Sequence, residues 1–278
     1  LDGALALEEM DDVAERIANS WHEVTVGPIR VMSHSIYTSL GTTVGLTIAI
    51  TLAGRASAAW LVAMTLTAII GAGLWAQLVE GSPQLLRPYG YFGSVVGVVA
   101  LAIAAAFAHA SAWMLLAVMG VGSAFAQAIG RGRCLVQGCC HGREAPGSLA
   151  IRYHHPMTRV VRLSSMGGVP IHPTPLYSAV WTAFVAFALL RLWQLAFPLQ
   201  FIVGAYFVLI GLGRFVEEHF RGEPQTSVIA GLRLYQWLAI GFVAGGAFLS
   251  TLGATPAPAP APFDLGILPL TIAVGGVS

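Results

Sequence analysis

Long apolar runs alternate with short polar separators along most of this chain. The runs cover positions 36–54, 58–79, 91–108, 112–129, 174–195, 197–215 and 234–252. Each is close to the ~20 residues that a helix needs to cross a bilayer. The separators carry turn residues, among them Gly81-Ser82-Pro83 and Phe197-Pro198,. This pattern predicts an all-α, polytopic integral membrane protein with about seven transmembrane helices.

The composition agrees with a membrane location. The chain is 56% hydrophobic and only 10% charged, whereas soluble domains carry about 25% charged residues. It contains no lysine, so all 14 basic residues are arginines, and 7 of its 13 acidic residues lie within the first 23 positions. A net charge of +1 without a basic helix or an RNA-binding motif excludes nucleic acid as a partner,.

Two end segments differ in composition from the predicted membrane domain, residues 28–253. Residues 1–27 form an acidic leader that starts with Leu1 rather than Met, as in a processed or truncated chain, and is too acidic for a signal peptide,. It is either a short amphipathic helix or a solvated cap. The apolar face of such a helix would contain Leu5, Ala6, Val13, Ile17 and Trp21,. Residues 254–278 combine an extended Ala/Pro linker with an apolar tail that is too short to span and lies at the interface or against the bundle,.

Polar residues gather on one side of the predicted membrane domain. Seven spans place residues 1–35, 80–90, 130–173 and 216–233 on the same face. Counted with Arg214, at the end of the sixth span, this face holds 12 arginines and every histidine except His109. The other face holds Arg55 and Arg191. Motifs that are far apart in the sequence therefore converge, as a single active site requires.

The densest polar stretch runs from Gly130 to Arg143 and directly follows the fourth apolar run. It contains three arginines, four glycines, one histidine and all three cysteines of the chain. An arginine near hydrocarbon costs about 2.5 to 3.5 kcal/mol on insertion scales, so the cluster indicates a polar cavity or an anionic ligand. Cys134, Cys139 and Cys140 allow a metal or thiol–disulfide site, although small buried residues explain them better.

Four further stretches lie on the same face. His34 stands at the start of the first span, and Gly93 begins a run that lets another helix approach closely,. The segment His172-Pro173-Thr174-Pro175-Leu176-Tyr177 opens the fifth span, with proline tolerated in the first helical turn,. Arg214, Glu218 and Arg221 are spaced i, i+4 and i+7, so they share one helix face on which the carboxylate can orient the arginines,.

Taken together, these motifs resemble the prolipoprotein diacylglyceryl transferase family over roughly residues 28–252. The resemblance rests on three motifs that follow one another on spans 4, 5 and 6. They are Gly130-Arg131-x-x-Cys134 with Gly138-x-x-x-Gly142, His172-Pro173-Thr174-x-Leu176-Tyr177, and Arg214-Phe215-x-x-Glu218-x-x-Arg221. Residues 29–41 and 87–97 match the family's first and third helices more loosely.

The family resemblance implies a membrane enzyme that moves the diacylglyceryl group of phosphatidylglycerol to the lipobox cysteine thiol of a prolipoprotein signal peptide. It implies a bacterial inner or plasma membrane location and no cofactor or metal. A phosphate leaving group calls for guanidinium donors, and similarity makes Arg131 and Arg214 the catalytic candidates. The remaining residues expected to bind substrate are Gly93, Gly130, Arg143, His172, Tyr177, Glu218 and Arg221.

The general base departs from the family pattern. A His or Tyr precedes two glycines in the family's third helix. The corresponding residue here is Phe92, whose ring has no group that can accept a proton. His34 and His141 are the candidate replacements, because imidazole titrates near neutrality. The alternatives are a diverged lipid-modifying relative with another acceptor, or a non-catalytic membrane protein that binds lipid or a partner.

The distribution of arginines and the family resemblance predict opposite orientations for the face that holds the motifs, called the motif face below. Twelve arginines against two would place it in the cytoplasm by the positive-inside rule,. The resemblance implies an extracytoplasmic motif face, with the N-terminus outside and the C-terminus inside. We follow the resemblance, because arginines that bind lipid phosphate do not report on insertion as ordinary loop charges do.

Overall fold

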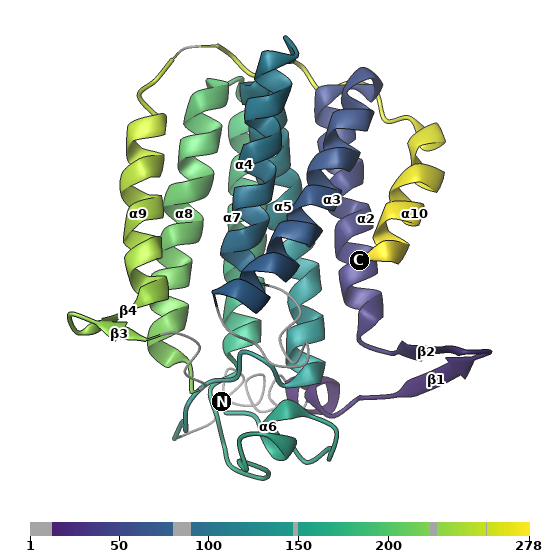
Figure 1. Cartoon of the computed structure of the whole chain (residues 1–278), viewed down its shortest axis with the longest axis vertical. Coiled ribbons are helices and arrows are strands. Elements are labelled where there is room, and N and C mark those ends of the chain that lie inside the picture. Colours follow the sequence, from purple (N-terminus) through teal and green to yellow (C-terminus); the bar gives the residue numbers. More distant parts are fainter. Residues whose placement is uncertain (1–12, 80–89, 147–149, 223–226, 254) are drawn as a thin grey trace, which may run out of the picture.

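Helices arranged side by side form the body of the protein (Figure 1). The computed structural model describes residues 13–79, 90–146, 150–222, 227–253 and 255–278. The long helices are α2 (Ser35–Ala53), α3 (Ala58–Leu78), α4 (Tyr91–Phe107), α5 (Ala112–Gln137), α7 (Thr174–Gln194), α8 (Leu199–Phe220) and α9 (Leu234–Leu249). The shorter elements are strands β1 (Glu23–Val26), β2 (Ile29–Met32), β3 (Val228–Ile229) and β4 (Leu232–Arg233), 3-10 turns η1 (Arg55–Ser57) and η3 (Leu265–Ile267), and helices α6 (Arg159–Arg162) and α10 (Leu268–Val277).

The all-α, polytopic membrane architecture predicted from the apolar runs is confirmed. Among the described residues, five helices are long and apolar enough to cross a membrane: α2, α3 with its preceding 3-10 turn, α5, α7 and α8. Helices α4 and α9 are also apolar but have only 17 and 16 residues. At 1.5 Å per residue they extend about 25 Å, somewhat less than the ~30 Å hydrocarbon thickness. Each of the seven predicted runs thus corresponds to one helix of the bundle.

Two helices extend beyond the apolar runs that predicted them. Helix α5 continues through Arg131 and Cys134 to Gln137, where Gly138 ends it in the left-handed conformation with φ 69°. Helix α8 continues to Phe220 and includes Glu217 and Glu218. The charged segments at these two ends are therefore helical rather than loops, which fixes the direction of their side chains.

Helix α5 is the central element of the bundle and contacts α2, α4, α7 and α8. Its contact with α2 depends on small residues. A Cβ atom on Gly41 would lie 2.6 Å from the carbonyl oxygen of Ala126, and one on Gly45 would collide with the carbonyl oxygen of Gly122. Such close backbone approach is typical of membrane helices, which associate through packing because lipid offers no hydrophobic drive.

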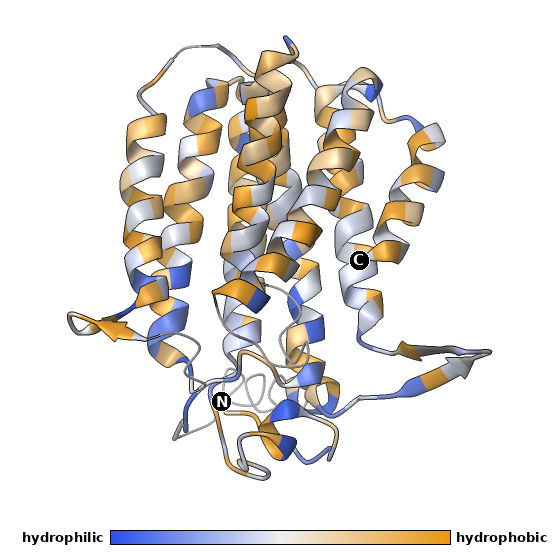
Figure 2. Cartoon of the chain, in the orientation of Figure 1, coloured by the Kyte–Doolittle hydropathy of each residue, from blue (hydrophilic) through white to orange (hydrophobic). Residues whose placement is uncertain are grey.

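One end of the bundle is markedly more polar than the other (Figure 2). At this end the long connection between α5 and α7 folds as a small head with its own apolar core. That core includes Ala14, Ala18, Ile151, Tyr153 and Val160. The connection is held to α8 by a bridge between Gly142 and Arg221, and internally by one between Ile151 and Ile171. The described part of the α5–α7 connection thus packs as a folded unit on the polar end of the bundle.

The two end segments both pack on the rest of the protein. Residues 13–18 are helical, with Ala14, Ala18 and Trp21 buried, Ile17 half-buried and Val13 exposed. Leu5 and Ala6 lie outside the described residues, as do all of positions 1–12 of the predicted leader. At the other end of the chain, α10 lies along α2, where the hydroxyls of Thr47 and Thr271 are 3.0 Å apart. The apolar tail therefore packs against the bundle, one of the two placements expected.

Candidate active site

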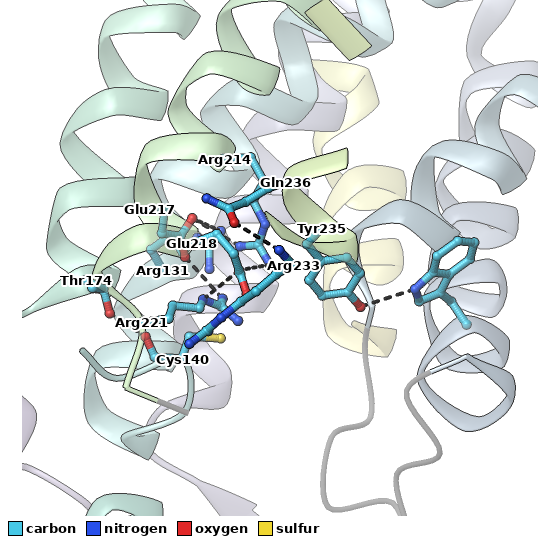
Figure 3. A network of polar contacts seen from close by, with 11 residues as sticks. Arg131, Cys140, Thr174, Arg214, Glu217, Glu218, Arg221, Arg233, Tyr235 and Gln236 are labelled. Atoms are coloured by element: carbon cyan, nitrogen blue, oxygen red, sulfur yellow. Dashed lines mark hydrogen bonds and ion pairs between the residues drawn. The ribbon is translucent and has the colours of Figure 1, made fainter. Parts of the chain in front are cut away.

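Two acidic residues of α8 hold a cluster of arginines at the polar end of the bundle (Figure 3). The α8 helix supplies Arg214, Glu217 and Glu218, and Arg221 follows its last turn. Helix α5 supplies Arg131. Strand β4 supplies Arg233, whose backbone N–H donates a 3.0 Å hydrogen bond to the Gln236 side chain at the start of α9. Three parts of the chain thus meet in one network.

Glu217 is the centre of this network. One carboxylate oxygen lies 3.4 Å from Arg131 Nη2 and 3.1 Å from Arg214 Nη1. The other oxygen accepts a 3.1 Å hydrogen bond from Arg221 Nη2. Glu217 therefore links the end of α5 to the end of α8.

Glu218 forms the second layer of the network. Its carboxylate lies 3.8 Å from Arg214 Nη2, 3.6 Å from Arg221 Nε and 3.4 Å from Arg233 Nη1. Its side chain is fully buried, so the charge has no water to stabilise it and depends on the arginines. The stripe of Arg214, Glu218 and Arg221 predicted from the sequence is therefore present.

The cluster carries more positive than negative charge. Four guanidinium groups face two carboxylates, which leaves an excess of two positive charges in this network. Arg214 Nε and Arg221 Nη1 are buried and have no hydrogen-bond acceptor among the described residues. Buried donors of this kind are costly unless a further acceptor reaches them. The arrangement is suited to an anion.

A cavity of about 420 Å³ opens beside the cluster between α2, α3, α4, α5 and α8. Its polar end is lined by Arg131, Arg214 and Arg221 and its apolar part by residues such as Val95 and Leu116. Gly130 also lines it, and a Cβ atom there would meet nothing within 4 Å. A space that is charged at one end and apolar along its length matches an anionic lipid.

A second cavity, of about 410 Å³, lies between α5, α7 and α8. Arg131 and Arg214 line both cavities. Tyr91 and Gln127 are also shared, and both join a hydroxyl network on Tyr206, at 3.2 and 3.3 Å. The arginine pair therefore stands between two spaces.

The start of α7 places His172 and Tyr177 at the rim of the cluster. His172 Nδ1 lies 3.2 Å from the Tyr177 hydroxyl, and its ring packs on Phe220 with centroids 5.0 Å apart. Arg143 is exposed, approaches His219 Nε2 to 3.3 Å and stacks over Phe220 at 5.8 Å. Partial burial and the charge of Arg143 lower the pKa of His172. Tyr177 lines the second cavity.

The two candidate bases have different surroundings, and both are buried. His141 Nδ1 lies 3.0 Å from the carbonyl oxygen of Gly142, and Nε2 lies 2.9 Å from the Ser164 hydroxyl. In the neutral ring, Nδ1–H therefore donates to the carbonyl and Nε2 accepts from the hydroxyl.

His34 packs against Trp21, with ring centroids 4.4 Å apart. Neither of its nitrogens has a hydrogen-bond partner in the part of the chain that the structure describes. Burial, together with the positive charge of Arg133, lowers the pKa of His34 to about 4. His34 is therefore neutral at pH 7.

Phe92 and Gly93 occupy a packed position on α4. Phe92 is buried among aromatic rings, including Tyr235 at 5.0 Å and Phe242 at 5.1 Å. A Cβ atom on Gly93 would collide with the carbonyl oxygen of Gly71 and with Trp75. Gly93 thus lets α3 and α4 approach each other, and its role in substrate binding stays a prediction. Within the matched stretch of residues 87–97, Arg87 to Tyr89 lie outside the described residues.

Three parts of the site were not predicted from the sequence. Glu217, the central carboxylate, is the first, although it lies three residues after Arg214 and four before Arg221 and so shares their helix face. Arg233 joins from a distant hairpin. Tyr235 lies under Arg214, whose guanidinium carbon is 5.4 Å from the ring centroid. No local pattern marks the last two residues, because their roles depend on the packing of α9 against α8.

A helical membrane bundle with a buried, positively charged cluster and an amphipathic cavity defines a class of membrane protein that handles anionic lipid-like ligands. The family model for prolipoprotein diacylglyceryl transferases matches residues 23–252. The chain therefore belongs to this family of membrane transferases.

Relatives carry the same family name. A "phosphatidylglycerol–prolipoprotein diacylglyceryl transferase 2" of Clostridium perfringens is 28% identical over 63% of this chain and 68% of its own length. A similarly named protein of Clostridium tetani is 28% identical over 38% of this chain and 40% of its own. One from Dehalococcoides mccartyi is 29% identical over 50% of this chain and 54% of its own length. For the last two, the chain aligns with well under two thirds of the relative's length.

We predict that Glu217→Gln strongly destabilises the protein. The substitution keeps the shape of the side chain but leaves three arginines without their shared carboxylate, and breaking a buried ion pair costs about 3 to 5 kcal/mol. The thermal unfolding midpoint in detergent should fall clearly. Arg55→Gln is the matched control, because the Arg55–Asp264 pair is exposed and such pairs contribute about 0 to 1 kcal/mol. Equal midpoints for the two variants would contradict the central role of Glu217.

Proposed function

We propose that this protein transfers the diacylglyceryl group of phosphatidylglycerol to the lipobox cysteine thiol of a prolipoprotein. The observation that carries the proposal is the arginine cluster, with its excess of two positive charges, at the polar end of an apolar cavity. The names of the relatives support the same donor and acceptor. The apolar length of the cavity would take acyl chains, and its charged end the phosphate.

The proposed reaction is a displacement at the glyceryl carbon that carries the phosphate. The acceptor thiol loses its proton to a base, its sulfur forms a C–S bond with this carbon, and the C–O bond to phosphate breaks. Glycerol phosphate then leaves with the bonding electron pair. The donor phosphodiester carries one negative charge and the leaving group gains a second, so a site with two excess positive charges favours the transition state over the bound lipid.

Within this scheme the arginines have different tasks. Arg131 and Arg214 line both cavities, so they are placed to contact phosphate oxygens from either side. Glu217 and Glu218 act as positioning residues, because each holds two or more guanidinium groups in fixed orientation. A guanidinium is suited to this task since its planar fork binds two oxygens at once.

We expect Arg131→Ala and Arg214→Ala each to reduce the rate of transfer about 10²- to 10³-fold. This loss is typical when a hydrogen-bond donor to the developing charge is removed. Thioether formation on a lipobox peptide with phosphatidylglycerol as donor measures the rate directly. Complementation of a cell that lacks the transferase measures it in the membrane. Arg191→Ala is the control, because Arg191 is an exposed residue at the opposite end of α7.

Each contrary result has a specific meaning. A variant that folds and keeps the full rate removes that arginine from the mechanism. Failure of the native chain to complement, despite normal membrane insertion, overturns the prolipoprotein acceptor. Release of glycerol phosphate from phosphatidylglycerol in the same cells would then favour a diverged relative with another acceptor, for which the unusual Phe92 position is the supporting observation.

His34 or His141 supplies the base in this proposal. His34 has two unpartnered nitrogens among the described residues and is neutral at pH 7, whereas both nitrogens of His141 are engaged. If His34 is the base, kcat/KM falls as pH drops through about 4, because protonation removes its lone pair. The substitution His34→Ala should slow transfer by about 10² to 10⁴. His141→Ala is compared separately, and normal rates in both variants would rule out this scheme.

We further propose that the arginine cluster faces the extracytoplasmic side of a bacterial inner or plasma membrane. In this orientation the chain after Leu252 lies in the cytoplasm. Fusion at that position of two reporters, one active only in the cytoplasm and one active only outside, should give signal from the cytoplasmic reporter alone. Signal from the external reporter would reverse the assignment.

A further inference from the structure

All three cysteines of the chain converge at one point beside the arginine cluster. The sulfur atoms of Cys134, Cys139 and Cys140 lie within 4.8 Å of one another, and no two of them are joined in a disulfide. The reaction proposed above uses none of these thiols, because its nucleophile belongs to the acceptor protein. The proposed reaction therefore gives the cysteine cluster no role.

We propose that these three cysteines form a binding site for a soft, thiophilic metal ion such as Zn²⁺ or Cu⁺. Thiolate ligands select these ions over hard cations such as Mg²⁺. With a metal–sulfur distance near 2.3 Å, three sulfurs around one ion lie roughly 4 Å apart. The sulfur atoms, all within 4.8 Å of one another, are compatible with this value.

The backbone fixes the three thiols in place. Cys134 lies on the last turn of α5, and Gly138 ends that helix with φ 69°. Cys140 itself adopts φ 60°, a conformation uncommon for a residue with a side chain,. Its carbonyl oxygen accepts a hydrogen bond from the Thr174 hydroxyl at the start of α7. The turn that returns Cys139 and Cys140 toward Cys134 is thus held from two sides.

The charge of the surroundings also suits the occupied site. Binding of a divalent ion by three thiols releases three protons and forms three metal–sulfur bonds, which leaves a complex of net charge −1. Arg131 and Arg221 line the same cavity as the three cysteines, and Figure 3 shows Cys140 next to Arg221. These arginines would stabilise the anionic complex, although they would repel a bare cation.

The site is also accessible to an ion. Cys134, Cys139 and Cys140 all line the 420 Å³ cavity, and Cys134 and Cys140 are half-buried. An ion that enters the cavity can therefore reach the sulfurs without unfolding of the helix end. Water or another small ligand can complete the coordination of Zn²⁺ from the cavity side.

Titration of the full-length protein in detergent with Cd²⁺, under reducing conditions, tests the proposal. Cd²⁺ is a spectroscopic stand-in for Zn²⁺ whose bonds to thiolates give an ultraviolet charge-transfer band. We expect the band to saturate at one equivalent, Zn²⁺ to displace it competitively, and the thermal unfolding midpoint to rise with either ion. Cys139→Ser should lose the band and the midpoint shift.

The matched control is His109→Asn, which removes a metal-binding side chain at the other end of the bundle. His109 has φ 58°, and asparagine tolerates this conformation,. This variant should bind one equivalent of Cd²⁺ as the native protein does.

The proposal is overturned if the band is absent although a thiol assay in denaturant finds all three cysteines reduced. Fewer than three reduced thiols before treatment with reductant, with no metal retained, would assign the cluster to a disulfide instead. These readouts do not depend on transferase activity, so the proposed function can fail or hold independently.

Discussion

The Glu217 carboxylate, shared by three arginines, is the interaction on which the architecture of the site depends. Arg131 comes from α5, whereas Arg214 and Arg221 come from α8. Each of these charges would be unfavourable by itself in a buried position at a membrane boundary. Because one carboxylate partly neutralises all three guanidinium charges, the two helices can bring their charged ends together. Glu218 extends the same compensation to Arg233 and thereby to the start of α9.

This compensation explains why the helices are longer than their apolar runs. Hydropathy alone ends the fourth run at Ile129, before the first arginine, yet α5 continues to Gln137. The backbone hydrogen bonds of a helix do not depend on side-chain polarity, so the helix continues wherever its charged side chains find partners. The extension matters for the site, since a helical Arg131 has a fixed direction that a loop residue would lack.

The sequence predicted the fold more fully than the site. Apolar runs located every long helix to within a few residues, except at the charged ends of α5 and α8, because bilayer thickness imposes run length directly. Helical spacing likewise placed Arg214, Glu218 and Arg221 on one face. It did not distinguish Glu217 from Glu218 as the shared partner of α5, since both lie within reach of the arginines along α8. Only the approach of α5 decides between them. The contacts of Tyr235 and Arg233 likewise depend on how α9 packs on α8, which no local pattern records.

The arginine cluster and the two candidate bases depend on different parts of the fold. Arg131, Arg214 and Arg221 are held by α5 and α8, which contact each other. His34 lies before α2, where it packs on Trp21, and His141 lies in the connection after α5. On α4, Phe92 fills an aromatic cluster and its ring cannot accept a proton. A change in the proton acceptor therefore need not disturb the charge compensation at Glu217.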